Sequence, residues 1–146
     1  MESRIESRAE VVSFISRMKH ALANGAKILF QVERGVEAKR DARYTNAFTI
    51  SDLFPDKNPT EALREELGKI EVDEYIETVK DVTYPGRSDM RVFGRRYNGK
   101  DDVYIKIRVE LFASDGNHLV FVMSFHYAMH PIPALMYPYG KTEEGK

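Results

Sequence analysis

The sequence predicts an α+β domain: an antiparallel β-meander of about four strands with helices packed on one face. Three observations predict it. Apolar residues recur at helical spacing near the N-terminus, a helix start lies at 58–61, and the apolar period changes to two after residue 86. With 146 residues, 42% of them hydrophobic, the chain is the size of one domain. We therefore expect a single globular domain over residues 1–140 and a disordered tail over 141–146.

Residues 4–23 are predicted to form an amphipathic helix, because apolar side chains recur every three or four residues. Asn24 and Gly25 end it, since both tolerate left-handed backbone. Alternating apolar residues predict a strand over 26–33, and 34–57 is interpreted as a long basic loop with a small extra strand. The helical pattern is carried by Ile5, Ala9, Val12, Ile15, Met18 and Leu22.

A second helix is predicted from Asn58 to Gly68. Asn58 caps it, and Pro59 occupies the first turn, where its missing N–H is not needed. Glu61, three residues after the cap, can reach back to the cap N–H. A further short helix is predicted over 73–82, where apolar residues form a rough stripe.

Three strands follow, MRVFGRRY, DDVYIKIRVELF and HLVFVMSF, joined by Asn98-Gly99 and by SDGN. A three-residue loop at 114–116, with its glycine in the left-handed conformation, predicts the register between the second and third of these strands. On the core face it pairs Leu111 with Leu119, Val109 with Phe121, Ile107 with Met123, and Ile105 with Phe125. On the other face it pairs Tyr104 with His126, Lys106 with Ser124, and Arg108 with Val122.

Burial predicts the register of the first hairpin. If Met90 and Val92 join Ile107 in the core, the residues between them turn to the opposite face. That face then carries Arg91, Arg95, Tyr104, Lys106, Arg108, Ser124 and His126. Such a cluster of cations favours an anionic partner, although the face could instead be solvated or partly covered by a helix.

Metal-independent RNA cleavage would use these residue types. It needs a base for the 2′-hydroxyl, an acid for the leaving 5′-oxygen, and cations for the phosphate charge. We predict His126, Tyr104 and Lys106 as catalytic residues. The predicted substrate-binding residues are Arg91, Arg95, Arg108 and Ser124. The alternative is a non-catalytic module that binds nucleic acid or protein on the same face.

Other motifs predict no further chemistry. No Walker or dinucleotide fingerprint occurs, so no cofactor is expected. His126 and His130 lack an HExxH glutamate between them and Pro131 follows, so no metal site is expected. The pairs Glu65/Glu66 and Asp101/Asp102 are interpreted as surface charge. Gly94 is interpreted as a bulge or a point of close packing.

Composition favours a soluble cytoplasmic protein. The absence of cysteine excludes disulfides and thiolate metal sites and fits a reducing compartment. The longest apolar stretch, Leu119 to Met123, is too short to span a membrane, and the opening MESRIESRAE has no apolar signal region. Basic residues outnumber acidic ones over 1–50 and 83–108, and acidic residues prevail over 51–82.

The C-terminal third, with FGRRYNGKDDVYIKIRVEL, then VMSFH and YPYG, resembles the MqsR-like toxins of bacterial toxin–antitoxin systems. The resemblance covers about 90–139. It implies a RelE-like fold, a metal-independent endoribonuclease that cuts mRNA, and a cognate antitoxin protein as partner. Tyr104 matches the tyrosine of the family's VYIKI-type strand. The family's catalytic lysine after the SF dipeptide falls on His126, a departure that leaves room for altered activity.

Overall fold

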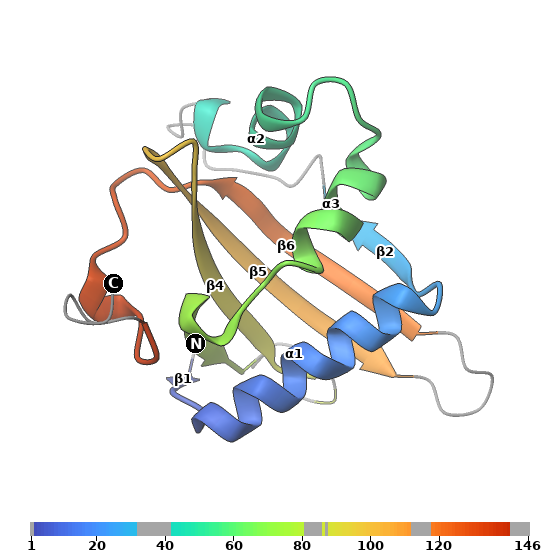
Figure 1. The fold of residues 1–146 in the computed structure, drawn as a ribbon, viewed down its shortest axis with the longest axis vertical. Coiled ribbons are helices and arrows are strands. Elements are labelled where there is room, and N and C mark those ends of the chain that lie inside the picture. The colour runs from blue at the N-terminus through green and yellow to red at the C-terminus, as the bar shows by residue number, and fades with distance from the viewer. Residues whose placement is uncertain (1, 32–41, 81–85, 87, 112–117, 141–146) are drawn as a thin grey trace.

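A computed structural model of the chain describes residues 2–31, 42–80, 86, 88–111 and 118–140. In these ranges three α-helices pack against a six-stranded sheet (Figure 1), which confirms the α+β class. The strands run in the order β1-β3-β4-β5-β6-β2, and every neighbouring pair is antiparallel except β6 and β2. The helices are α1 (Arg8–Ala23), α2 (Asn46–Leu53) and α3 (Pro59–Leu67). The strands are β1 (Ser3–Arg4), β2 (Lys27–Phe30), β3 (Tyr75–Val79), β4 (Met90–Tyr97), β5 (Asp101–Leu111) and β6 (His118–Tyr127).

Helix α1 begins later than the predicted 4–23. Ser7 caps it through a reciprocal pair of hydrogen bonds with Glu10, and the preceding Ser3–Arg4 pairs with β3 as a strand. The buried face of α1 includes Val11, Phe14 and Met18. The predicted apolar stripe is wrong at Ile5, Ala9 and Val12, which are exposed. The end of α1 is confirmed, because Asn24 is its C-cap and Gly25 has φ +82°.

Helix α3 is confirmed with its cap. The Asn58 side chain accepts hydrogen bonds from the backbone N–H groups of Thr60 and Glu61, at 2.9 and 3.4 Å. The helix predicted over 73–82 is wrong. A single 3₁₀ turn, η2 (Val72–Glu74), is followed by β3, and residues 81–85 lie outside the described ranges.

A bulge in β3 explains that error. The register against β4 shifts between Tyr75 and Glu77. As a result Ile76 and Val79 share one face of the sheet, and their three-residue spacing imitates a helix in the sequence.

The extra strand predicted within 34–57 is also wrong where the chain is described, because TNAFTI opens α2. A 3₁₀ turn, η1 (Ala42–Tyr44), precedes it. Asn46 donates to the carbonyls of Gln31 (2.8 Å) and Met123 (2.9 Å), and it accepts from Phe125 N–H (3.0 Å). Thr49 Oγ1 accepts from Tyr127 N–H at 2.9 Å. Side chains of α2 therefore satisfy the backbone of β6 beyond the end of β2.

The β5–β6 register follows the prediction near the end of β6. Tyr104 pairs with His126, and Lys106 with Ser124. Beyond Lys106 a bulge shifts the pairing by one residue. The predicted pairs Ile107–Met123, Val109–Phe121 and Leu111–Leu119 are therefore wrong, and the observed pairs are Ile107–Val122, Arg108–Phe121, Val109–Val120 and Leu111–His118.

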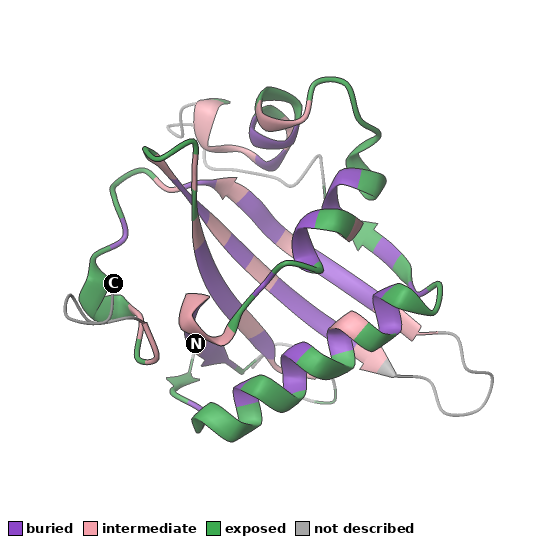
Figure 2. Cartoon of the chain, viewed as in Figure 1, coloured by how far each residue is buried: buried purple, intermediate pink, exposed green. Residues whose placement is uncertain are grey.

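The predicted face of β4 is inverted. Phe93 pairs with Ile105 and Arg91 with Ile107, so these odd-numbered residues share the helix-covered face. Met90 and Val92 lie on the opposite face. The sheet therefore buries apolar groups on both sides, with a smaller second cluster that includes Ile132. Consecutive residues of β4 and β5 are accordingly coloured as buried in Figure 2.

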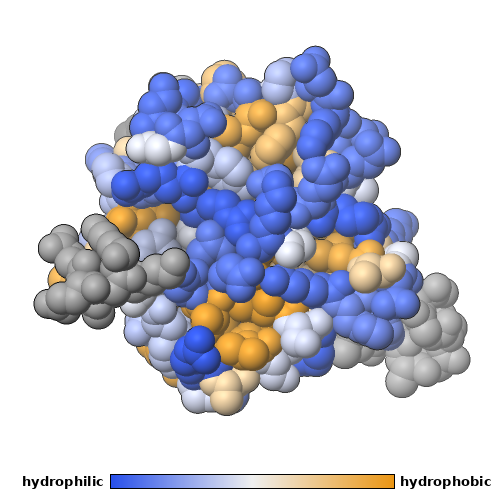
Figure 3. Space-filling model, viewed as in Figure 1, coloured by the Kyte–Doolittle hydropathy of each residue, from blue (hydrophilic) through white to orange (hydrophobic). Residues whose placement is uncertain are grey.

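The helical side of the molecule faces the viewer in Figure 3. Its surface is mostly hydrophilic, interrupted by separate apolar patches. The opposite side of the sheet, which we call the second face, carries Tyr104, Lys106, Arg108, Ser124 and His126.

Candidate functional site

Tyr104 and His126 form the centre of the candidate site. They are directly opposite each other on β5 and β6, and their ring centroids lie 6.3 Å apart with planes inclined by 30°. Both side chains are half-buried. The Asn46 and Thr49 hydrogen bonds to Phe125 and Tyr127 fix the β6 backbone on both sides of His126. The predicted juxtaposition of Tyr104 and His126 is therefore confirmed.

A cavity of about 350 Å³ adjoins these two rings. Tyr44 from η1 joins them, and the segment after β6 supplies the rest of the wall. Those remaining lining residues are Ala128, Met129, His130, Pro131, Ile132, Pro133 and Met136. The lining is dominated by aromatic and apolar groups, with two imidazoles and two phenols that can donate or accept protons.

The hydrogen bond of His126 determines which ring nitrogen can act as a base. Its Nδ1 lies 3.0 Å from the carbonyl oxygen of Tyr127. A carbonyl only accepts, so Nδ1 carries the proton and donates it. In the neutral ring the lone pair is then on Nε2, and this nitrogen is the one able to take a proton from a substrate.

Lys106 and Ser124 form the next cross-strand pair on the second face, two residues from Tyr104 and His126 along their strands. Two residues of strand correspond to about 7 Å. Lys106 is half-buried and Ser124 is buried. Lys106 thus lies on the same face as Tyr104 and His126, one cross-strand pair along the sheet.

Arg108 shares the second face but lies deeper. Its guanidinium is 4.7 Å from the ring centroid of Phe121 and pairs with Glu110 at 3.0 Å, with the side chain 5% exposed. This geometry engages Arg108 in internal contacts. It does not support the predicted phosphate contact.

The placement of Arg91 and Arg95 corrects the predicted site. Both lie on the helix-covered face, because the β4 register is opposite to the predicted one. Arg91 binds Glu6, and Arg95 makes two hydrogen bonds to Glu74 at 2.7 and 2.8 Å. Burial opposes the charge of Arg95, but the Glu74 hydrogen bond and charge outweigh burial and raise its pKa. Arg91 and Arg95 are structural cations and do not belong to the candidate site.

Two acidic residues interpreted as surface charge are instead buried. Asp102 accepts from Arg96 Nε at 3.0 Å and from the backbone N–H of Ile132 at 2.7 Å. Glu66 accepts from Tyr97 Oη at 2.7 Å. The backbone carbonyl of Asp102 also accepts a hydrogen bond from Ala128 N–H. Through its contacts with Ala128 and Ile132, Asp102 holds the segment that forms the cavity wall.

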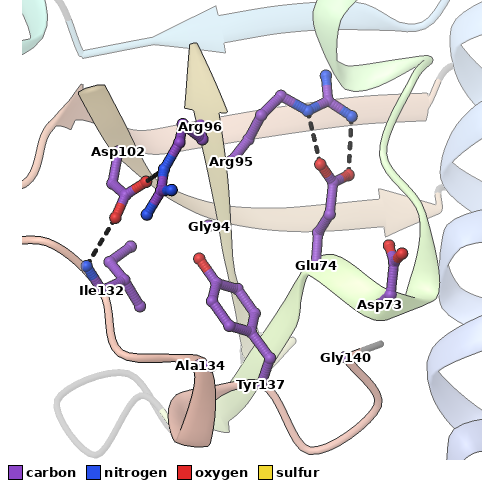
Figure 4. A pocket seen from close by; sticks show the side chains of 10 residues that line it. All are labelled: Asp73, Glu74, Gly94, Arg95, Arg96, Asp102, Ile132, Ala134, Tyr137 and Gly140. Carbon is purple, nitrogen blue, oxygen red and sulfur yellow. Dashed lines mark hydrogen bonds and ion pairs between the residues drawn. The ribbon is translucent and has the colours of Figure 1, made fainter. Parts of the chain in front are cut away.

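A second cavity, of about 360 Å³, lies beside Gly94 (Figure 4). Tyr137 projects toward Gly94, between the Arg96–Asp102 pair and the Arg95–Glu74 pair. Burial, followed by the charges of Asp102 and Glu74, raises the pKa of Tyr137 to about 12. The β4–β5 register runs unbroken through Gly94, so this glycine marks close packing and not a bulge.

Gly94→Ala is expected to lower the free energy of unfolding by about 1–3 kcal/mol, the usual penalty for overpacking. A Cβ there would collide with Tyr137 Oη and lie 2.9 Å from Ile132 Cδ1. Urea denaturation measures the change. Gly86→Ala is the control, since a Cβ at Gly86 has nothing within 4 Å. Adding Tyr137→Phe to Gly94→Ala removes the nearest atom and should recover part of the lost stability. If the two substitutions change the free energy of unfolding additively, the clash is contradicted.

No pattern in the sequence indicated Tyr44, Ile132 or Met136 as cavity residues. Tyr44 comes from a stretch interpreted as a loop, and the other two follow the last of the three predicted strands. The predicted β5–β6 register and the family resemblance both indicated Tyr104 and His126.

No set of three or more His, Asp or Glu side chains that could hold a metal occurs among the described residues. No helix within the described ranges is long and apolar enough to cross a membrane. The chain matches no family model, no curated protein and no solved structure.

Proposed function

We propose that this protein is a metal-independent endoribonuclease whose catalytic centre is Tyr104, His126 and Lys106. The observation that carries the proposal is the pairing of a phenol and an imidazole, 6.3 Å apart between ring centroids, beside a cavity on the second face. A base and an acid on opposite sides of a phosphodiester are the two groups that this reaction needs.

The reaction would proceed as a transesterification. His126 Nε2 takes the proton of a ribose 2′-hydroxyl, and the 2′-oxygen bonds to the adjacent phosphorus. The bond from phosphorus to the 5′-oxygen of the next nucleotide breaks, and the Tyr104 hydroxyl gives that oxygen a proton. The products are a 2′,3′-cyclic phosphate and a 5′-hydroxyl end. Transfer of the imidazolium proton back to the phenolate restores the starting state.

Lys106 is the cation that we assign to the phosphate. An ammonium group stabilises the charge that develops on the non-bridging oxygens in the transition state. Ser124, directly across from Lys106, would donate a hydrogen bond to the same phosphate. The roles predicted for Arg91 and Arg95 are withdrawn, and Arg108 supports the sheet through Phe121 and Glu110.

The resemblance to MqsR-like toxins supports the same function, because it includes the strand that carries Tyr104 and the VMSFH segment that ends at His126. On this basis we also propose mRNA as the substrate and an antitoxin protein as the partner. A lysine-to-histidine change at the acid–base position retains a group able to transfer protons.

The experiment is cleavage of a mixed mRNA pool by the purified chain in EDTA, with the new ends mapped. We expect 2′,3′-cyclic phosphate and 5′-hydroxyl ends. An RNA oligonucleotide that contains a mapped site should be cut at that site. The same oligonucleotide with a single 2′-deoxy substitution there should not be cut. A folded protein that binds RNA without cutting it would contradict the proposal and favour a non-catalytic binding module.

A further inference from the structure

We propose that the cavity beside Tyr104 and His126 is a subsite for one unpaired nucleobase. The 5′-phosphate of that nucleotide is directed toward Lys100 and Arg43, and its 3′-phosphate, where the chain is cut, toward Lys106. This inference rests on the proposed function for its choice of ligand, and it assigns a base-stacking role to Tyr44.

The lining of the cavity suits a base. Three rings, Tyr44, Tyr104 and His126, come from three different elements and meet around one cavity. Unpaired bases stack on tyrosine and histidine rings regardless of sequence, because every base has a π-face. The apolar contacts of Ile132 and Met136 complete the wall. At about 350 Å³ the cavity is near the lower end of the range for small-molecule sites, about 300–1,000 Å³, so it fits a single nucleoside.

An adjoining cavity of about 200 Å³ supplies the charge. It shares Tyr44 and the residues 128–131 with the first cavity, so those residues form the partition between the two. Its lining includes Lys100, from the turn between β4 and β5, and Arg43, next to Tyr44. Lys100 is exposed, and Arg43 lies with its guanidinium 4.5 Å from the Tyr127 ring centroid and 3.2 Å from Asp101.

Both cations therefore line a cavity that shares a wall with the aromatic cavity. A nucleotide has the same division, with a flat apolar base joined through its sugar to an anionic phosphate. The acidic neighbours Asp101 and Asp102 are each engaged by an arginine, Arg43 and Arg96 respectively, which offsets their charge. Lys100 adds an exposed ammonium group to the same lining.

Nucleoside monophosphates test this subsite without any cleavage reaction. AMP, CMP, GMP and UMP are titrated against the full chain by NMR, with ribose 5-phosphate as the matched ligand that lacks a base. We expect the preferred nucleotide to bind roughly 5- to 150-fold more tightly than ribose 5-phosphate, the value of one base–aromatic stack. The His126 and His130 ring signals should shift on binding.

Variants separate the two parts of the subsite. Tyr44→Ala should remove most of the difference between nucleotide and ribose 5-phosphate, whereas Tyr44→Phe should retain it. Lys100→Gln should weaken both ligands by the same factor. Because Tyr44 also contacts the core, Met136→Ser at an exposed position is the second variant, and it should also reduce the base-dependent difference.

Equal binding of nucleotides and ribose 5-phosphate by the wild-type chain overturns the subsite. A preference that Tyr44→Ala and Met136→Ser leave intact also overturns it. RNA cleavage without base-dependent binding would leave the ribonuclease standing and remove the subsite. Base-dependent binding by a chain that does not cut RNA would support the subsite and contradict the proposed ribonuclease.

Discussion

Arg91→Ala is expected to lower the free energy of unfolding by about 3–5 kcal/mol, because it leaves Glu6 as a buried carboxylate without its counter-ion. Arg91 Nε and Nη2 donate to the two carboxylate oxygens of Glu6 at 2.8 and 3.1 Å. The Glu6 side chain is 4% exposed and the Arg91 side chain 13%. The guanidinium also lies 4.7 Å from the ring centroid of Phe14, so the variant loses packing against α1 as well.

Urea denaturation with a surface control measures this effect. Arg4→Ala removes the exposed partner of Asp89 and should change the free energy of unfolding by no more than about 1 kcal/mol. The double variant Glu6→Gln with Arg91→Met removes both charges. It should be more stable than Arg91→Ala, since no isolated buried charge remains. A loss in Arg91→Ala as small as that in Arg4→Ala would show that Glu6 is not held as a buried anion.

The same pair should make the protein sensitive to acid. Burial disfavours the charge of Glu6, but hydrogen bonds from Arg91 and Thr78 outweigh burial and hold its pKa below the ordinary glutamate range. A lowered pKa in the folded state contributes stability above the pKa of the unfolded chain, and that stability is lost as the pH falls through the folded pKa. Glu6→Gln should flatten the acid side of the stability–pH curve, and an unchanged slope would contradict this assignment.

The Glu6 network also connects segments that are distant in the sequence. Thr78 Oγ1 of β3 donates to Glu6 Oε1, and the backbone N–H of Glu6 donates to Tyr75 Oη at 3.0 Å. Tyr139 Oη donates to the Glu6 carbonyl at 2.5 Å. The C-terminal segment that walls the candidate site is thus attached at Asp102 and again at Glu6. Loosening the second attachment should therefore affect ligand binding as well as stability.

Local patterns predicted the elements whose neighbours in space are also neighbours in sequence. The Asn58 cap of α3 and the Asn98-Gly99 turn are short-range features, and both are confirmed. The pairing of Tyr104 with His126 is confirmed as well, but the predicted loop at 114–116 lies outside the described ranges, and the register nearest to it differs from the prediction by one residue. The bulge beyond Lys106 restores the predicted pairing, so that Ile105 and Phe125 share the core.

The errors in the faces of β4 and β6 have a common physical origin, namely the assumption that only one face of the sheet is buried. Met90 and Val92 are buried, but in the second cluster with Ile132, so their hydrophobicity does not identify the helix-covered face. Likewise the bulge in β6 turns Phe121 to the second face, where it belongs to the second cluster. The segment that covers this face comes from the C-terminus, and no local pattern in β4 or β6 indicates it. For this reason the sequence could place Tyr104 and His126 together but could not place Arg91 and Arg95.

His126→Ala is expected to reduce kcat for RNA cleavage by about 10²- to 10⁴-fold, the usual contribution of a general acid or base. Tyr104→Phe, which preserves the ring and removes only the hydroxyl, should cause a loss in the same range. His118→Ala is the matched control, because His118 is on the same strand but lines a different cavity, with Ser16 and His20. Its kcat should equal that of the wild type.

Two readouts distinguish catalysis by His126 from a structural role. A base must be unprotonated, so log kcat of the wild-type protein should rise with a slope of about 1 on the acid side of its pH profile, and His126→Ala should lose that limb. Added imidazole should restore part of the lost activity, because it can enter the space left by the side chain and supply the missing base. If His126→Ala keeps the acid limb and imidazole has no effect, the base is another group, and His130 in the same cavity becomes the residue to replace next.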